Sequence, residues 1–178
     1  MSEQKQGAVA TLISRLEEEK AAAGAEIAIA SEAILRFQLG RETYGIPIDQ
    51  VKGISRLRPI TFVPGTPAYV LGVCNQAGSV IPVISLSDLL GGSNHETSRD
   101  SRLITIHSNE VGEGDIGILV DRVQDVIAVP LNAVEAPLLT LERSGNFLRG
   151  QHRQPDGKIV LLLDLPALLR LITNRAGG

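Results

Sequence analysis

The chain has 178 residues, enough for one compact domain or for two small lobes that share a core. Its formal net charge of −3 argues against a nucleic-acid-binding protein, because such proteins need clustered lysine and arginine to neutralise phosphates. A single cysteine excludes an internal disulfide and a cysteine-based metal cage, and the 3% aromatic content leaves a core of valine, isoleucine and leucine, which favours strands.

Residues 1–30 are predicted to form an N-terminal arm that contains a helix. Its apolar residues follow the spacing of one helix face: Val9, Leu12, Ile13 and Leu16. Gly24 ends this pattern. Two interpretations stay open: the helix packs on its own body or frays, or it docks on a partner. The first is favoured because terminal segments are commonly poorly ordered.

From residue 33 onward the pattern changes to short strands joined by turns. The segments with a strand pattern are 33–40, 43–48, 79–86, 102–108 and 116–129. The first two are predicted to pair as a β-hairpin, residues 76–78 to turn the chain into the third, and Ser87 to cap a single helical turn. Residues 91–101 are polar and form the expected junction between two halves. Near the end, Asp164 is predicted to cap a short C-terminal helix with Pro166 in its first turn.

The second half of the chain repeats the first. Three blocks recur in the same order: residues 44–54 at 116–126, 69–72 at 147–150, and 78–90 at 157–169. Such a repeat implies two copies of one small fold, predicted as paired β-barrels rather than a βαβ sheet. We therefore expect a first lobe at about 33–91, a second lobe at about 101–173, and a seam between them where a partner binds.

No group of reactive residues points to catalysis. Residues 112–117 spell GxGxxG, but a strand-like segment follows where a nucleotide-binding motif needs a helix, so a hairpin turn is predicted. The histidines lack metal-ligand spacing: His95, His107 and His152. Asp49 and Asp121 occupy equivalent places in the two halves and are predicted to accept hydrogen bonds from turn amides. No catalytic, cofactor-binding or metal-binding residue is expected.

Several remaining features have structural interpretations. Cys74 lies in an apolar run and is predicted to be a buried, inert thiol. Arg56 and Arg58 are interpreted as a solvated strand edge. The chain starts without a secretory pattern, and its longest apolar run, at 159–169, is too short to span a bilayer, so a cytoplasmic location is expected.

Four apolar residues have two open interpretations: Val51, Ile54, Val123 and Val126. If both pairs project toward the seam, they form an apolar groove that suits an amphipathic helix or the tip of a helical hairpin. The alternative is that these side chains fill the two barrel cores.

In its repeated segments the chain resembles the CheW-like coupling proteins of bacterial chemosensory arrays. The resemblance extends from about residue 34 to 172 and rests on four stretches: 44–54, 63–90, 116–129 and 148–169. It implies an all-β fold of two five-stranded SH3-like barrels around a shared core. It also implies a cytoplasmic adaptor without enzymatic activity or cofactor, recruited to membrane-associated receptor arrays. The implied partners are the cytoplasmic tip of a methyl-accepting chemoreceptor and the regulatory domain of a CheA-type histidine kinase.

The resemblance further implies two binding surfaces. The receptor-binding groove would consist of Ile48, Asp49, Val51, Ile54, Val120 and Val123. The segment at the receptor or kinase interface would include Gly72, Asn75, Ala77 and Gly78.

Three residues depart from the family pattern. Ala77 stands where the family has arginine, Gly53 where an acidic residue is common, and Ser85 where aspartate is usual, although the second half keeps Asp164. We interpret these as a changed polar recognition surface in the first half. Alternatives are a paralogue that binds receptors but not the kinase, a member that serves a twitching or surface-sensing pathway, and, more distantly, a β-barrel enzyme or metal protein.

Overall fold

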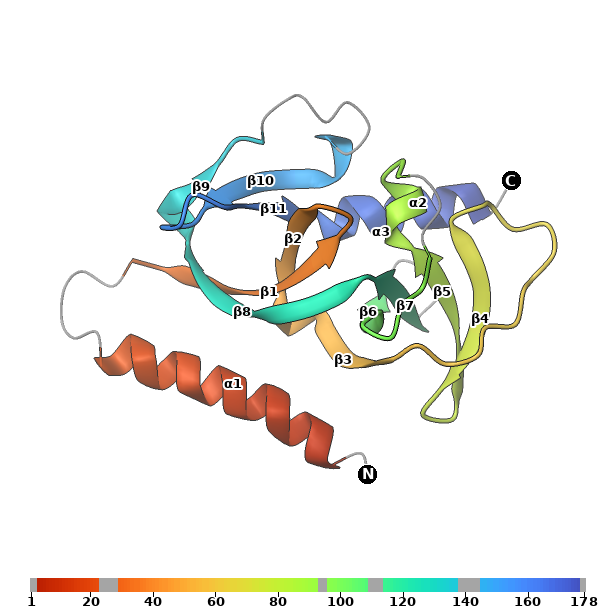
Figure 1. The fold of residues 1–178 in the computed structure, drawn as a ribbon, viewed down its shortest axis with the longest axis horizontal. Coiled ribbons are helices and arrows are strands. Elements are labelled where there is room, and N and C mark those ends of the chain that lie inside the picture. The colour runs from red at the N-terminus through yellow and green to blue at the C-terminus, as the bar shows by residue number, and fades with distance from the viewer. Residues whose placement is uncertain (1–2, 23–28, 93–95, 109–113, 138–144, 177–178) are drawn as a thin grey trace.

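The computed structural model describes residues 3–22, 29–92, 96–108, 114–137 and 145–176. Its described part consists mainly of strands, which form two sheets and therefore two β-lobes (Figure 1). An N-terminal helix lies outside the lobes and a C-terminal helix packs against them. The predicted all-β fold class with two lobes is confirmed.

The helices are α1 (Glu3–Ala22), α2 (Leu86–Leu89) and α3 (Leu165–Ala176), and short 3-10 turns lie at η1 (Ile48–Gln50), η2 (Leu131–Ala133) and η3 (Gly145–Phe147). The strands are β1 (Ser31–Leu39), β2 (Glu42–Pro47), β3 (Val51–Arg56), β4 (Val70–Gln76), β5 (Ser79–Ser85), β6 (Arg102–Ser108), β7 (Gly114–Val120), β8 (Arg122–Pro130), β9 (Val134–Glu135), β10 (Leu148–Arg153) and β11 (Ile159–Leu163).

The two sheets exchange strands between the repeated halves. Sheet A has the strand order β8-β1-β2-β11-β10-β9, and sheet B has the order β3-β6-β7-β5-β4. Each sheet thus combines a hairpin from one half of the chain with strands from the other half. The predicted lobe segments at about 33–91 and 101–173 therefore do not coincide with the physical lobes, because strand pairing crosses the junction in both directions.

The repeat itself is retained in the register of the parallel strands. In sheet A, β2 runs parallel to β11 with Gly45 opposite Leu162. In sheet B, β7 runs parallel to β5 with Gly117 opposite Val83. These two pairs are related by the same sequence shifts that relate the repeated blocks, so the halves of the chain occupy equivalent positions in the two sheets.

Both glycines of these parallel pairs are required by close packing. A Cβ atom added to Gly45 would lie 2.5 Å from Ile34 Cγ2, and one added to Gly117 would lie 2.8 Å from Leu103 Cδ1. The two contacts are equivalent, since Ile34 and Leu103 are both buried on the neighbouring strand of a hairpin. The same close approach of a buried side chain to a glycine is thus present in both lobes.

One hydrophobic core joins the two lobes. It contains Phe37 and Tyr44 from sheet A, stacked with ring centroids 6.2 Å apart, together with Ile104 and Ile118 from sheet B. Leu168 from α3 packs into the same cluster. Because strands of both halves line this core, the lobes are expected to unfold as one cooperative unit.

A smaller cluster within sheet B contains Cys74, which is 3% exposed. Burial raises the pKa of its thiol above the ordinary value, which lowers the fraction of reactive thiolate. The predicted burial of this cysteine is confirmed.

The two short helices inside the repeat begin with equivalent side-chain caps. Ser85 Oγ accepts a hydrogen bond from the Asp88 amide at 3.2 Å, and Asp164 Oδ1 accepts one from the Ala167 amide at 2.9 Å. The cap predicted for Asp164 is confirmed. The cap predicted for Ser87 is wrong, because the extended residue that precedes the helix is Ser85.

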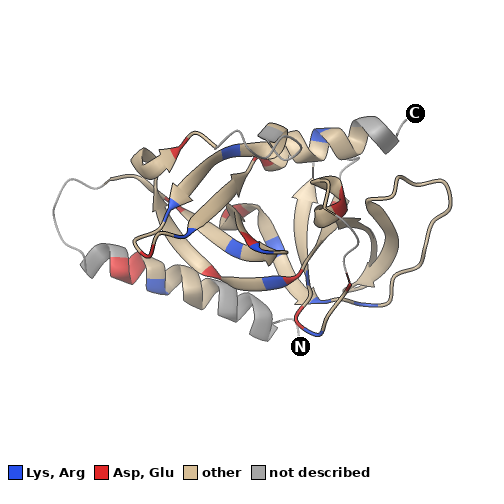
Figure 2. Ribbon diagram, turned by 45° about the horizontal axis from the view of Figure 1, so that its top comes forward, with Lys and Arg blue, Asp and Glu red and all other residues tan. Residues whose placement is uncertain are grey.

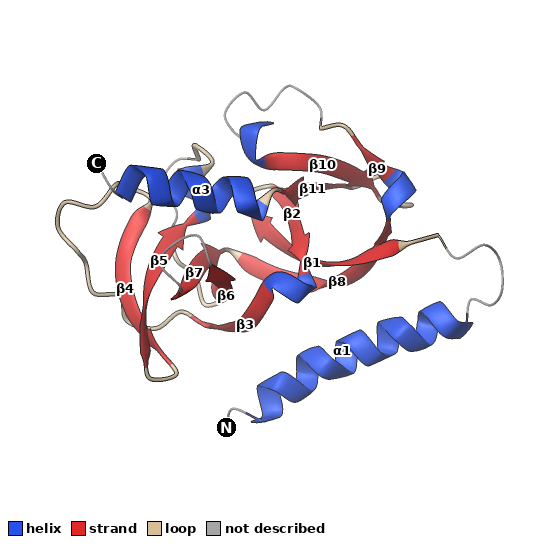
Figure 3. Ribbon diagram, turned by 180° about the vertical axis from the view of Figure 1, so that it is seen from behind, coloured by secondary structure: helices blue, strands red, loops and turns tan. Residues whose placement is uncertain are grey.

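Helix α1 lies beside β8 in both views of the fold (Figures 1 and 3). Leu12 and Ile13 of its predicted apolar face are 44% and 37% exposed, while Leu16 is half-buried. The apolar face is therefore only partly covered by the protein body. Gly24, predicted to end the helical pattern, lies outside the described residues. No helix within the described ranges is both long and apolar enough to cross a membrane.

Candidate partner-binding surfaces

The predicted seam is formed by one edge strand from each sheet. Strand β3 ends sheet B and β8 ends sheet A, and side chains of both strands pack against the common core. Four half-buried side chains on these strands pack against the common core, and we call them the seam residues: Val51, Ile54, Val123 and Val126. Each contributes to the core and keeps part of its surface accessible. The interpretation as core residues is therefore partly confirmed, and the apolar groove for a partner stays a prediction.

Equivalent strand irregularities place the seam residues. The pairing of β3 with β6 shifts between Val51 and Gly53, and the pairing of β1 with β8 shifts opposite Val123. Such β-bulges bend a strand and re-aim its side chains, and they occur often at sheet edges. The bulge, like the apolar residues, therefore occurs in both halves of the repeat.

The structure divides the predicted groove residues into two groups. Asp49 is exposed on η1, whereas Ile48 is only 7% exposed and packs in the core. Val120 is fully buried at the end of β7, an interior strand of sheet B. The placement of Ile48 and Val120 on the groove surface is therefore corrected: both are core residues. Val126, identified by the repeat, lies on the seam instead.

A polar cluster borders the seam on the side of sheet B. Lys52 Nζ lies 2.5 Å from Asp115 Oδ2, and His107 Nδ1 lies 3.1 Å from Asp115 Oδ1. The hydrogen bond from Lys52 lowers the pKa of Asp115 below its ordinary value, with a smaller contribution from His107. Asp115 is thus held ionised as part of a fixed ion pair. Gly53, next to Lys52 on β3, faces open space, so a side chain at this position would be accommodated.

The second predicted surface is the tip of the β4–β5 hairpin. Asn75 Oδ1 accepts a hydrogen bond from the Gly78 amide at 3.0 Å, which closes the turn. Ala77 and Gly78 have φ values of 52° and 90°, the left-handed conformations required by a two-residue hairpin loop. All three residues are exposed, and Val80, opposite Asn75 in the hairpin, is 70% exposed. The tip presents a small apolar surface beside an open turn.

Gly72 has a different position from the other residues of this segment. It is buried at a bulge in β4 with a φ of 138°, and a Cβ atom there would lie 2.1 Å from the carbonyl oxygen of Thr61. The glycine is therefore required by the approach of the neighbouring backbone. The packing explains why this position is glycine, and its predicted contact with a partner stays a prediction.

The family model described as CheW-like domain matches residues 33–173 of this chain. The chain belongs to the CheW family. It is 30% identical over 138 residues to the chemotaxis protein CheW of Bacillus subtilis (strain 168), covering 78% of this chain and 86% of that relative. It is 33% identical over 132 residues to the chemotaxis protein CheW of Treponema pallidum (strain Nichols), covering 72% and 77%. The crystal structure of scaffolding protein TtCheW from Thermoanaerobacter tengcongensis is similar with a TM-score of 0.68 and 30% identity, covering 76% of this chain and 90% of that one.

The two described histidines and Asp164 have separate local partners in this CheW-family structure. His107 contacts Asp115, His152 Nδ1 lies 3.2 Å from the Ala133 carbonyl oxygen, and Asp164 caps α3. Asp121 accepts a hydrogen bond from the Gly40 amide at 2.7 Å, as predicted for an aspartate near a turn. No group of three potential metal ligands occurs among the described residues.

Two other sequence predictions concern segments that are described only in part. His95 and the first two residues of the GxGxxG segment lie outside the described residues. The last four residues of this segment already belong to β7, which runs antiparallel to β6 and continues beyond the segment where a nucleotide-binding motif would need a helix.

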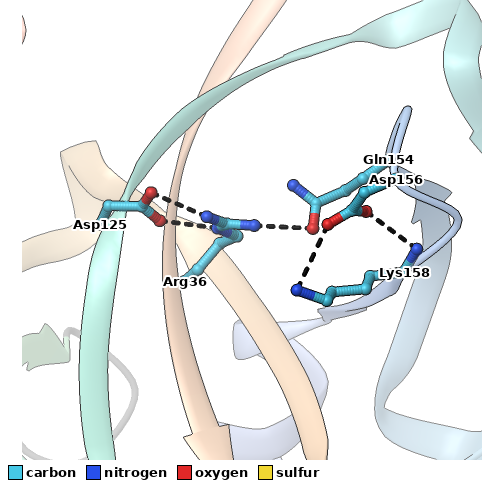
Figure 4. A network of polar contacts seen from close by, with 5 residues as sticks. All are labelled: Arg36, Asp125, Gln154, Asp156 and Lys158. Atoms are coloured by element: carbon cyan, nitrogen blue, oxygen red, sulfur yellow. Dashed lines mark hydrogen bonds and ion pairs between the residues drawn. The ribbon is translucent and has the colours of Figure 1, made fainter.

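A polar network on sheet A was not predicted from the sequence. The Arg36 guanidinium donates two hydrogen bonds to Asp125, at 2.6 and 2.7 Å, and a third to Gln154 Oε1 at 2.7 Å (Figure 4). It connects β1, the seam strand β8 and the turn between β10 and β11. Nearby, Asp156 pairs with Lys158 within that turn. No local motif could identify these contacts, because the partners come from distant parts of the sequence.

Proposed function

We propose that this chain is a non-enzymatic adaptor that couples the cytoplasmic tip of methyl-accepting chemoreceptors to the regulatory domain of a CheA-type histidine kinase. The observation that carries the proposal is the pair of matching, half-exposed apolar positions at the seam between β3 and β8. An amphipathic helix buries its apolar face in such a surface. Family membership and relatives named as chemotaxis and scaffolding proteins support the same assignment.

The location of the two candidate surfaces supports a bridging role. The seam includes β3, at one end of the strand order of sheet B, and the hairpin tip belongs to β5 and to β4 at the other end. Receptor and kinase would therefore bind without competing for one surface. We assign the receptor to the seam, and the kinase to the hairpin tip around Asn75, Ala77 and Val80. The adaptor would act in the cytoplasm and reach membrane-associated arrays by binding the receptor.

The receptor assignment is tested with a soluble cytoplasmic fragment of a chemoreceptor from the same genome. We expect Val51→Asp to weaken binding of this fragment at least about tenfold, because a carboxylate would be desolvated beneath an apolar helix face. The matched control Val80→Asp places the same charge on the hairpin tip and should leave receptor binding unchanged. Calorimetric titration measures both affinities.

Circular dichroism determines whether each variant is folded. Loss of the folded signal in Val51→Asp would show that this residue is core and that the seam assignment is wrong. The equivalent variant Val123→Asp provides a second test from the other sheet. Binding that is unaffected in folded forms of both seam variants would contradict the proposed receptor surface.

A second candidate function is a receptor-binding paralogue that does not bind the kinase. It is favoured by Ala77, which occupies the exposed hairpin turn but lacks the multiple donors of the arginine common in the family. A pull-down with the regulatory domain of the cognate kinase separates the two functions. The coupling function requires that the chain binds the kinase domain at micromolar concentration, and Ala77→Arg should strengthen this kinase binding. Absence of kinase binding with intact receptor binding would favour the paralogue.

A further inference from the structure

Beside the seam lies a basic hollow that the proposed function does not yet use. It has a volume of about 510 Å³ and lies at the end of β3, where the chain turns toward β4. The described residues that line it include three arginines and no carboxylate: Ile54, Ser55, Arg56, Leu57, Arg58, Pro59 and Arg102. Figure 2 shows Lys and Arg positions in blue, including the stretch that leaves β3. In a chain with net charge −3, such a cluster needs an explanation.

The strand register forces two of these arginines together. Arg56 and Arg102 are directly opposite each other in the pairing of β3 with β6. Like charges in such cross-strand pairs are destabilising. Arg102 Nη1 donates hydrogen bonds to the backbone carbonyls of Arg99 and Ser101, both at 2.9 Å, but these acceptors carry no charge. The repulsion is therefore not relieved by this contact.

The two arginines on the β3 side of the hollow are available to a partner. Arg56 and Arg58 are exposed, and within the described parts of the chain neither takes part in an ion pair. A guanidinium group binds a carboxylate through two parallel hydrogen bonds, so exposed arginines of this kind match an acidic segment. The apolar residues that also line the hollow, Ile54, Leu57 and Pro59, would contact the methylene groups of such a segment.

We propose that the hollow binds acidic side chains of the same receptor helix that occupies the seam, an inference that rests on the proposed function. Ile54 belongs to both surfaces, so a helix lying along the seam continues into the hollow. The apolar seam residues would hold the helix, and the arginines would set its register and select receptors with glutamate or aspartate at this end. The alternative is that the arginines only protect an edge strand from pairing with another chain.

The test compares two double charge reversals in otherwise intact protein. Arg56→Glu with Arg58→Glu alters the hollow, whereas Arg41→Glu with Arg153→Glu changes exposed arginines elsewhere by the same net charge. Binding of the soluble receptor fragment is measured by calorimetric titration. We expect the hollow variant to bind about tenfold more weakly at low salt, because attraction becomes repulsion at two rim positions. The control variant should bind like wild type.

Salt provides an independent readout of the same contact. Raising the salt concentration from about 0.1 M to about 1 M shortens the Debye length from about 10 Å to about 3 Å. Wild-type binding should weaken several-fold over this range, while binding by the hollow variant should not weaken. Changing the acidic residues of the receptor fragment to lysine should restore its binding to the hollow variant.

Each contrary outcome has a distinct meaning. If wild type does not bind the receptor fragment at low salt, the proposed function fails and the inference fails with it. If wild type binds but both double variants match it, only the inference is overturned and the arginines act as edge protection.

Vesicles containing anionic phosphatidylglycerol form a separate arm of the experiment. Vesicle binding that only the hollow variant loses, with receptor binding unchanged, would assign the hollow to lipid headgroups and overturn the proposal.

Discussion

The serine at position 85 shows how one residue can be misinterpreted without its surroundings. The family resemblance places aspartate there, and by pattern alone Ser85 indicates a change in the recognition surface. In the structure Ser85 is 2% exposed and caps α2, just as its repeat counterpart Asp164 caps α3. The substitution exchanges one preferred N-cap for another. The departures at Gly53 and Ala77, both accessible in the structure, remain the places to test for changed specificity.

The cap assignment predicts a specific pattern of stability. Ser85→Ala should lower the free energy of unfolding by about 1 kcal/mol, because the Asp88 amide loses its acceptor, whereas Ser85→Asp should retain the cap. Ser87→Ala, two residues along, should change it by less than about 0.5 kcal/mol. Urea denaturation measures all three. A larger loss in Ser87→Ala than in Ser85→Ala would show that the wrong serine has been identified as the cap.

The lowered pKa of Asp115 predicts that the polar cluster makes a pH-dependent contribution to the stability of the fold. Its pKa is lowered in the folded state, first by the Lys52 hydrogen bond, so folding favours the ionised carboxylate. The stabilisation is present above the unfolded pKa of about 3.9 and is lost as the pH falls through the lower folded value. The free energy of unfolding of the wild type should fall as the pH is lowered through this range, and we expect it to fall less in Asp115→Asn.

Chemical denaturation across the acidic range checks this expectation. Lys52→Gln should flatten the same part of the curve, because it removes the main cause of the lowered pKa. The double variant should add little to either single variant. A curve for Asp115→Asn that runs parallel to wild type would contradict the assignment.

At the scale of elements, sequence patterns locate strands better than they identify strand neighbours. Turn residues between apolar runs predict the β1–β2 hairpin and the turn into β5, and the structure pairs β1 with β2 and β4 with β5. The pairing of β1 with β8 and the network around Arg36 were not predicted. Local turns bring hairpin strands together, whereas β8 reaches β1 only through packing across the whole fold. Arg36 then holds β8 in place through Asp125 and so helps to position one side of the seam.

This role of Arg36 predicts a measurable coupling. In a double-mutant cycle with Arg36→Gln and Asp125→Asn, we expect a coupling energy of about 0.5–1 kcal/mol, since the pair is bidentate but Asp125 is half-exposed and screened. The exposed pair Asp156 and Lys158 serves as the matched control and should show no measurable coupling. Urea denaturation at two salt concentrations measures both cycles. Equal values for the two pairs would show that the Arg36 contact does not hold β8.

At the scale of the whole molecule, the exchange of strands makes the two repeated halves depend on each other. Sheet B places the β6–β7 hairpin of the second half between strands of the first, and sheet A does the reverse with β1 and β2. The main core contains side chains from both halves. Neither half therefore contains a complete sheet of its own, although each contains a full copy of the repeat.

This arrangement predicts the behaviour of the separated halves. Residues 29–92 and 93–178, expressed alone, should each lack cooperative thermal unfolding, because β3 loses β6 and β8 loses β1. Mixing them should restore the strand signal seen by circular dichroism for the intact chain. Cooperative unfolding of either half by itself would contradict the exchanged topology as the source of stability.

The amino-acid sequence alone determined the class of the fold, the presence of the repeat and most of the seam. Alternating apolar residues and turn residues act over short distances, so the local pattern is enough to place Val51, Ile54 and Val123 on matching strands. Tertiary structure decided which of the predicted groove residues are accessible. Val120 follows the same local pattern as its neighbours but is fully buried, because β7 lies in the interior of its sheet.

The basic hollow likewise depends on which strands become neighbours in the sheet. Arg56 is recognisable in the sequence as an edge-strand charge, but only the pairing of β3 with β6 brings Arg102 opposite it. Which distant strands become neighbours depends on how two repeated halves bury their apolar faces in one core. That is a property of the assembled molecule, and it decides both where the lobes lie and which charges meet beside the seam.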